Sequence, residues 1–177
     1  FSSIAALGDS TESQPIITEE TDWNPEKIHS DYAISKHGAE MEIWRGQQEG
    51  LNVIVLNIGV VMANDKDFLL SLRKKGMRFY PQGATGFIAV EDVVEVATQL
   101  MRSEIVNESF VLIEDNYSFQ EIVAIIEKRL HLPPSKVRLT PLMLAFLWRI
   151  DWFLSTFFFK KRTLSQAVSK MLSSKNQ

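Results

Sequence analysis

The sequence of 177 residues contains no cysteine. This excludes a disulfide framework, a thiol nucleophile and a cysteine-ligated metal site, and it fits a reducing compartment such as the cytoplasm. Histidine is scarce too. His29, His37 and His131 lie too far apart for metal-ligand spacing, so no zinc site is expected. A net charge of −3 predicts no basic face, and nucleic acid is therefore not an expected partner.

Long uncharged apolar runs are also missing. Arg149 and Asp151 interrupt the most apolar stretch, 142–159, whereas a membrane span needs about 20 largely uncharged residues. We interpret this stretch as a buried or partner-facing helix. The alternative for 142–162 is a helix that forms a homodimer or touches a membrane surface, because the basic residues 160–162 follow directly. The first residues do not resemble a signal peptide, since no basic region precedes an apolar run there.

The order of the predicted elements indicates an α/β fold. Residues 1–7 are small or apolar and predict a buried strand, and a polar loop follows over 9–30. A helix is then expected from Ser30 or Asp31 to about residue 48, with one buried face formed by Tyr32, Ala33, Ala39, Ile43 and Trp44.

The β-branched run 51–62 predicts a strand that is buried on both faces, as in a parallel sheet covered by helices. The order strand, loop, helix, strand is the repeat of a doubly wound parallel sheet. Later elements are expected as a helix over 67–75 that ends at Gly76, a strand at 86–90, a helix over 91–102, a strand at 108–115, and a helix from Ser118 to Leu130 with Glu121 in a capping box.

Three residue types that suit proton transfer occur near the carboxyl end of the first strand. Tyr32 and Lys36 are four residues apart, which places both on one face of a helix. Alone, this pair also fits an ordinary helix start. A tyrosine hydroxyl has a pKa near 10, and a nearby ammonium group favours the charged phenolate. Serine hydroxyls at Ser2 and Ser3 could orient a substrate oxygen, whereas a redox step would need a cofactor.

The segments "SSIAALG", "DYAISKHGAE", "LNVIVLNIGVV" and "GFIAVEDVVEVA", taken together, resemble the C-terminal part of an extended short-chain dehydrogenase/reductase. This is the NAD-dependent epimerase/dehydratase superfamily. The residues of the segments "SSIAALG" and "GMRFYPQGATGFIAVEDVV" favour its dihydroflavonol-4-reductase-like branch. The resemblance extends to about residue 130. It implies a Rossmann fold with a small, mostly helical substrate-side region, and NAD or NADP as cofactor.

The resemblance also assigns roles to residues. It implies that Tyr32 is the general acid/base, that Lys36 tunes Tyr32 and binds the nicotinamide ribose, and that Ser3 is the catalytic serine, with Ser2 as the alternative. The turn that would contact the nicotinamide through its backbone falls on Asn57, Ile58, Gly59 and Val60, and Ile58 stands where the family has a proline.

The family's Gly-rich dinucleotide cradle is not found in these 177 residues, because no G-x-G-x-x-G sequence occurs. The resemblance therefore implies a missing N-terminal segment as a partner, and an isolated chain with little activity. It assigns 1–62 to the Rossmann domain with the Ser/Tyr/Lys site. It assigns 63–177 to a substrate-side region, from which 86–114 returns to the Rossmann core.

The implied function is that of an NAD(P)-dependent oxidoreductase or epimerase/dehydratase. The substrate would be a carbonyl or alcohol of a small molecule, such as a nucleotide sugar or a dihydroflavonol-like ketone. The alternative is a non-catalytic binding or regulatory module with the same fold. The substrate pocket depends on loops whose sequence carries no recognisable pattern.

Overall fold

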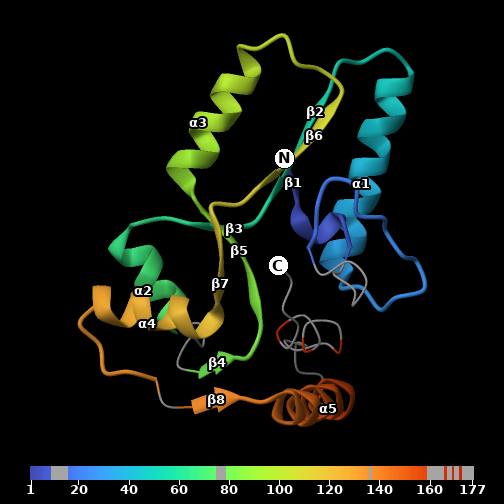
Figure 1. Cartoon of the computed structure of the whole chain (residues 1–177). Coiled ribbons are helices and arrows are strands. Elements are labelled where there is room, and N and C mark those ends of the chain that lie inside the picture. Colours follow the sequence, from blue (N-terminus) through green and yellow to red (C-terminus); the bar gives the residue numbers. More distant parts are fainter. Residues whose placement is uncertain are drawn as a thin grey trace. The chain divides into compact units, whose positions relative to one another are not determined.

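A computed structural model of the chain describes residues 1–8, 16–74, 79–135 and 137–158, together with Gln166, Ser169 and Leu172 (Figure 1). Two sequence-based expectations lie outside these residues, namely the helix end at Gly76 and the basic residues 160–162. The chain divides into two compact units. The first unit contains residues 1–63 and 86–116, and the second contains 64–85 and 117–176.

The first unit is built on a parallel three-stranded sheet, as the sequence predicts. The strand order is β1–β2–β6, and both pairings are parallel. The elements are β1 (Ser2–Ser3), the 3₁₀ helix η1 (Ile4–Ala6), α1 (Asp31–Gln48), β2 (Ile54–Ile58), β3 (Val60–Met62), β5 (Ala84–Ala89), α3 (Val90–Met101), β6 (Glu108–Leu112) and β7 (Asp115–Ser118). Strands β5 and β7 each cross the division between the units.

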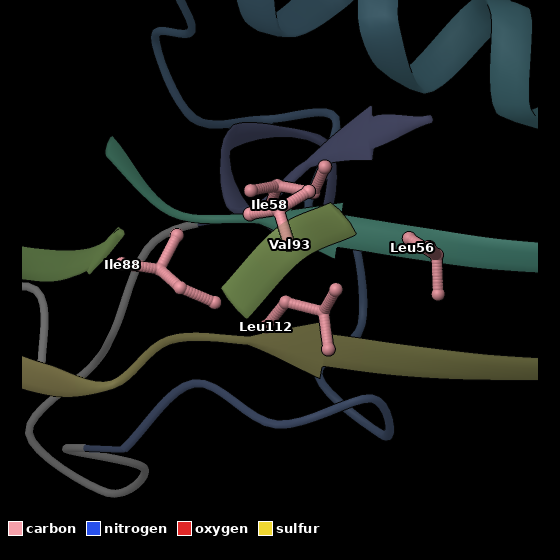
Figure 2. Close-up of a cluster of buried hydrophobic side chains, with 5 residues drawn as sticks. All are labelled: Leu56, Ile58, Ile88, Val93 and Leu112. Atoms are coloured by element: carbon pink, nitrogen blue, oxygen red, sulfur yellow. The ribbon is translucent and has the colours of Figure 1, made fainter. Parts of the chain in front are cut away.

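Helices α1 and α3 lie on opposite sides of strands β2 and β6 (Figure 1). Successive side chains of a strand point to opposite faces. Leu56 and Ile58 accordingly pack with Val93 of α3, whereas Asn57 between them contacts Glu40 of α1. Figure 2 shows the α3 side of this core, a cluster of Leu56, Ile58, Ile88, Val93 and Leu112. The doubly covered parallel sheet thus confirms the predicted fold class.

Helix α1 begins where the sequence predicts. The hydroxyl of Ser30 accepts a hydrogen bond from the backbone N–H of Ala33 over 3.1 Å, which is the expected N-cap contact. Its predicted buried face is correct for Ala33 but wrong for Tyr32 and Ile43. Tyr32 is 57% exposed and Ile43 is also exposed, while Ala33 and Glu40 are the buried residues of the helix. The face toward the sheet buries a carboxylate instead of an apolar stripe, because polar partners on β1 and β2 lie opposite it.

The predicted strand over 1–7 is wrong beyond Ser3. The hydroxyl of Ser3 accepts a hydrogen bond from the N–H of Ala5 over 3.3 Å and starts the short helix η1. Gly8 follows with φ of +103°, a conformation that glycine adopts without strain. The chain therefore turns off the sheet edge directly after β1, and the segment that leads to α1 begins there.

The predicted strand over 51–62 is divided at Gly59 into β2 and β3. Strand β3 pairs in parallel with β5 in a separate sheet of order β3–β5–β7. A Cβ at Gly59 would lie 2.6 Å from the carbonyl oxygen of Gly86 and 2.9 Å from Cγ2 of Ile113. The missing side chain therefore permits the close approach of backbones at the point where the two sheets separate.

The second unit contains α2 (Lys66–Lys74), β4 (Phe79–Pro81), α4 (Phe119–Arg129), β8 (Val137–Leu139) and α5 (Pro141–Phe158). Strands β4 and β8 pair in parallel, and the sequence did not predict either of them. The predicted capping box is present, because Ser118 and Glu121 bond each other's backbone N–H groups. None of the helices among the described residues is both long enough and apolar enough to cross a membrane.

Candidate active site

Ser3, Tyr32 and Lys36 all belong to the first unit, and they occupy the end of β1 and the first turns of α1. Ligands of open parallel sheets bind beyond the carboxyl ends of the strands, which is where β1 ends at Ser3. One contact between α1 and the start of β1 is made by Lys36. Its Nζ donates a hydrogen bond to the carbonyl oxygen of Phe1 over 3.4 Å. The ammonium group is therefore hydrogen-bonded to the residue that lies two positions before Ser3 in the sequence.

The two candidate serines have different environments. The hydroxyl of Ser2 donates a hydrogen bond to Oε2 of Glu40 over 2.7 Å, so it faces the sheet side of α1. The hydroxyl of Ser3 accepts from Ala5 and keeps its own hydrogen for another acceptor, since a hydroxyl can both donate and accept. Ser3 is thus the serine whose donor capacity is left over at the end of the strand.

The tyrosine is accessible and the lysine is half-buried. Tyr32 is the second residue of α1, and its hydroxyl makes no hydrogen bond to any residue that the structure describes. Lys36, one turn later, uses one of its three N–H donors on Phe1. The helix amino terminus carries partial positive charge, which favours a negative charge on groups in its first turn. The two side chains share one edge of α1, as the four-residue spacing predicts.

The four residues predicted to contact a nicotinamide lie at the junction of β2 and β3. The side chain of Asn57 is fully buried, and that of Ile58 belongs to the core cluster. The N–H of Gly59 donates to the carbonyl oxygen of Leu112 over 3.0 Å. Val60 is exposed. The side chains of Asn57 and Ile58 are therefore engaged inside the protein, and a backbone contact of this turn with a cofactor stays a prediction.

Sequence inspection missed a buried polar network beneath the candidate residues. Oε2 of Glu40 accepts from Ser2 and, over 2.9 Å, from Nδ2 of Asn57, while Oε1 lies 3.5 Å from Nε1 of Trp44. Oδ1 of Asn57 accepts from the hydroxyl of Ser109 over 2.8 Å. One signal could have revealed it, because Glu40 follows Lys36 by four residues and Tyr32 by eight, on the same side of the helix.

A second missed feature is a stack of three rings. The indole of Trp23 lies between the imidazoles of His29 and His37, with ring centroids 3.7 Å and 4.2 Å apart. His37 Nδ1 lies 3.1 Å from the carbonyl oxygen of Ala6, an acceptor, so this nitrogen carries the hydrogen. The stack fastens the loop before α1 to the helix and to η1. His37 is thus half-buried and engaged in packing.

Metal binding has no support in the described residues, where no group of three or more acidic or histidine side chains could hold an ion. On the second unit, Glu121 takes part in the capping box of α4. The pKa of this carboxyl is lowered because the side chain and then the backbone N–H of Ser118 donate hydrogen bonds to it. The shift reflects helix capping and has no connection with the candidate site.

No protein-family model and no curated protein matches the sequence. Solved structures do match the fold. One is gox2253, with a TM-score of 0.74, 21% identity, and coverage of 96% of this chain and 54% of that one. Another is a nucleoside-diphosphate-sugar epimerase from Pseudomonas aeruginosa, with a TM-score of 0.73, 14% identity, and coverage of 97% and 62%. A third is UDP-glucose 4-epimerase from Thermotoga maritima, with a TM-score of 0.60, 20% identity, and coverage of 77% and 48%.

These likenesses establish that the chain has part of the Rossmann-like fold of the two epimerase structures. The chain spans about half to three fifths of the length of these three proteins. Its similarity to the dihydroflavonol-reductase-like branch stays a prediction. The roles of the individual site residues also stay predictions.

Proposed function

We propose that this chain carries the proton-transfer residues of an NAD(P)-dependent oxidoreductase or epimerase/dehydratase. The substrate class is a carbonyl or alcohol of a small molecule, either a nucleotide sugar or a dihydroflavonol-like ketone. The observation that carries this proposal is the position of Lys36. Its hydrogen bond to Phe1 joins the second turn of α1, four residues after the exposed Tyr32, to the start of the strand that ends at Ser3.

In this proposal Tyr32 moves the proton. Tyr32 is exposed and its hydroxyl makes no hydrogen bond to the described residues, so the hydroxyl is available to a substrate oxygen. During reduction Tyr32 would donate its proton to the carbonyl oxygen, and during oxidation it would take the proton of the alcohol. The phenolate that remains lies in the first turn of α1, where the helix dipole and the ammonium of Lys36 favour negative charge.

Ser3 positions the oxygen on which this proton transfer occurs. Its hydroxyl accepts from Ala5, which fixes the direction of the side chain and leaves its hydrogen for the substrate. Such a donor, acting together with Tyr32, would hold a carbonyl oxygen in one orientation and would stabilise negative charge developing on it. Two of the three donors of Lys36 also remain for hydroxyl groups of a bound ligand.

The residues at this edge fit the nicotinamide-ribose end of a dinucleotide. When bound, such a cofactor supplies the hydride that no protein side chain can transfer. Lys36 would hold its ribose hydroxyls, and backbone groups near Gly59 and Val60 would face its amide. The proposal has support from similar structures, since a dTDP-glucose 4,6-dehydratase from Bacillus anthracis is described in complex with NAD, and RMD from Pseudomonas aeruginosa with NADPH.

The test is made with the whole protein and with this chain alone. Turnover would be measured with UDP-glucose and dTDP-glucose in the presence of NAD⁺, and with dihydroquercetin in the presence of NADPH. We expect one of these probes to react with the whole protein. This chain alone should bind NAD⁺ and NADP⁺ weakly or not at all, because its 177 residues contain no Gly-rich cradle. A whole protein that binds neither dinucleotide would contradict the proposal and favour a non-catalytic binding module.

A further inference from the structure

A buried carboxylate connects the elements that carry the candidate residues. Glu40 is only 7% exposed, and it lies on the face of α1 that packs against the sheet. Burial of a carboxylate is costly unless hydrogen bonds compensate for the lost water. Here a hydroxyl from β1 and an amide from β2 both donate to the same oxygen, Oε2, over 2.7 and 2.9 Å. The partners come from two strands far apart in sequence, so the contact is tertiary and not local.

The hydrogen-bond network continues beyond Glu40 and fixes the orientation of the Asn57 amide. Nδ2 of Asn57 donates to Glu40 and, over 3.4 Å, to the carbonyl oxygen of Ser3. Oδ1 of Asn57 accepts from the hydroxyl of Ser109 on β6. Two acceptors, on Glu40 and Ser3, face Nδ2 of Asn57, and a donor, the Ser109 hydroxyl, faces Oδ1. These partners allow only one orientation of the amide. One chain of hydrogen bonds therefore crosses α1, β1, β2 and β6.

Glu40 and Lys36 together connect α1 to the residues that precede Ser3. The two residues are four apart on α1, and they hold successive residues of the chain. Lys36 binds the carbonyl oxygen of Phe1, Glu40 binds the hydroxyl of Ser2, and Ser3 comes next. Two consecutive turns of the helix are thus hydrogen-bonded to the two residues immediately before Ser3.

We propose that Glu40 is a positioning residue, which holds β1 against α1 and so sets the geometry of Ser3 relative to Tyr32. This inference rests on the proposed function. Glu40 itself touches no substrate, because it is buried beneath the strand. A displacement of about 1 Å between reacting groups can lower a rate by roughly 100-fold. Loosening β1 should therefore lower kcat, while the groups that bind substrate keep their affinity.

The experiment uses Glu40→Gln in the whole protein, with Glu42→Gln as the matched control on the exposed side of α1, where Glu42 pairs with Arg45. Glutamine keeps the shape of the side chain but is a weaker acceptor for the two donors. With the reactive probe among UDP-glucose, dTDP-glucose and dihydroquercetin, we expect kcat to fall roughly 10- to 100-fold with little change in KM. Glu42→Gln should leave both constants unchanged.

A second readout does not depend on catalysis. Amide hydrogen exchange of residues 1–8 should become faster in Glu40→Gln, whereas exchange in β6 should stay the same. A merely structural role would lower the melting temperature and leave kcat unchanged well below that temperature. If Glu40→Gln does not fold, Ser109→Ala provides the test from the far end of the network, with Ser103→Ala as its control. Ser109→Ala should lower kcat several-fold at unchanged KM, and a wild-type kcat would overturn the proposal.

Tyr32→Phe, measured in parallel, separates the two proposals. If Tyr32→Phe is inactive and Glu40→Gln has wild-type kcat, the positioning role is overturned and the proposed function stands. If Tyr32→Phe keeps full activity, the proposed function fails, and the positioning role fails with it. Loss of kcat in both variants, together with faster exchange over residues 1–8 in Glu40→Gln, is the result that supports the positioning role.

Discussion

The amide of Asn57 donates a hydrogen bond of 2.9 Å to the carboxylate of Glu40, between a central strand and the helix that covers it. Asn57 is fully buried and Glu40 nearly so. A polar pair at this depth is stable only because every group in it has a partner. The relationship fixes α1 on the sheet, and the candidate active site is built on the first turns of that helix.

Asn57→Ala should destabilise the chain by about 3 kcal/mol, because it leaves a buried carboxylate and the hydroxyl of Ser109 without their shared partner. Urea denaturation at pH 7 measures the change. Asn116→Ala is the matched control, since Asn116 is exposed. Equal midpoints for the two variants would show that the network contributes little to stability.

Lys36→Met should weaken binding of NAD⁺ or NADP⁺ to the whole protein by roughly 10-fold or more. Hydrogen bonds from a charged group contribute about 1.5–3 kcal/mol each, and methionine keeps only the apolar stem. Isothermal titration calorimetry gives the two dissociation constants. The control is Lys66→Met at the exposed start of α2. An unchanged affinity in Lys36→Met would remove Lys36 from the cofactor site.

Gly59→Ala and Gly38→Ala should change stability in opposite directions. A methyl group at Gly59 would meet a backbone carbonyl oxygen at 2.6 Å, and we expect a loss of about 1–3 kcal/mol. A methyl group at Gly38, inside α1, has no atom within 4 Å, and removing a helical glycine should add up to about 1 kcal/mol. Thermal unfolding of both variants distinguishes the signs. Stabilisation by Gly59→Ala would contradict the described close approach to Gly86.

The charge of Glu121 should give α4 a pH-dependent stability. Ser118 lowers the pKa of this carboxyl in the folded chain below its ordinary value of 4.5. The contribution is therefore present above that ordinary value, and it is lost as pH falls through the lowered pKa. Melting temperatures of the wild type and Glu121→Gln should differ at pH 7 and converge in acid. In a Ser118→Ala background the pH-dependent difference should become smaller, because only the backbone N–H at position 118 still donates to Glu121; an undiminished difference would refute the role of the Ser118 hydroxyl.

Elements set by local chemistry could be predicted from the sequence. Ser30 and Ser118 cap helices where their hydroxyls reach a backbone N–H, and the β-branched run around Val55 forms a buried parallel strand. Such signals depend on neighbours within a few residues. The order of these elements was sufficient to predict the α/β fold class.

Features that depend on distant partners could not be predicted in this way. The apolar spacing of α1 indicated a buried face through Tyr32 and Ile43, but Glu40 is buried because Ser2 and Asn57 lie opposite it. The end of β1 at Ser3 depends on a single hydroxyl that starts η1. The stack of Trp23 on two histidines likewise joins residues from a loop and a helix, and no sequence pattern predicts it.

The most direct test of the central claim is the kcat of Tyr32→Phe in the whole protein, measured with the probe that reacts and compared with Tyr80→Phe. Phenylalanine keeps the ring and removes only the hydroxyl. Because general acid/base catalysis contributes about 10²- to 10⁴-fold, we predict a loss in that range for Tyr32→Phe and none for Tyr80→Phe. Normal turnover by Tyr32→Phe would contradict the assignment of Tyr32 as the proton-transfer residue.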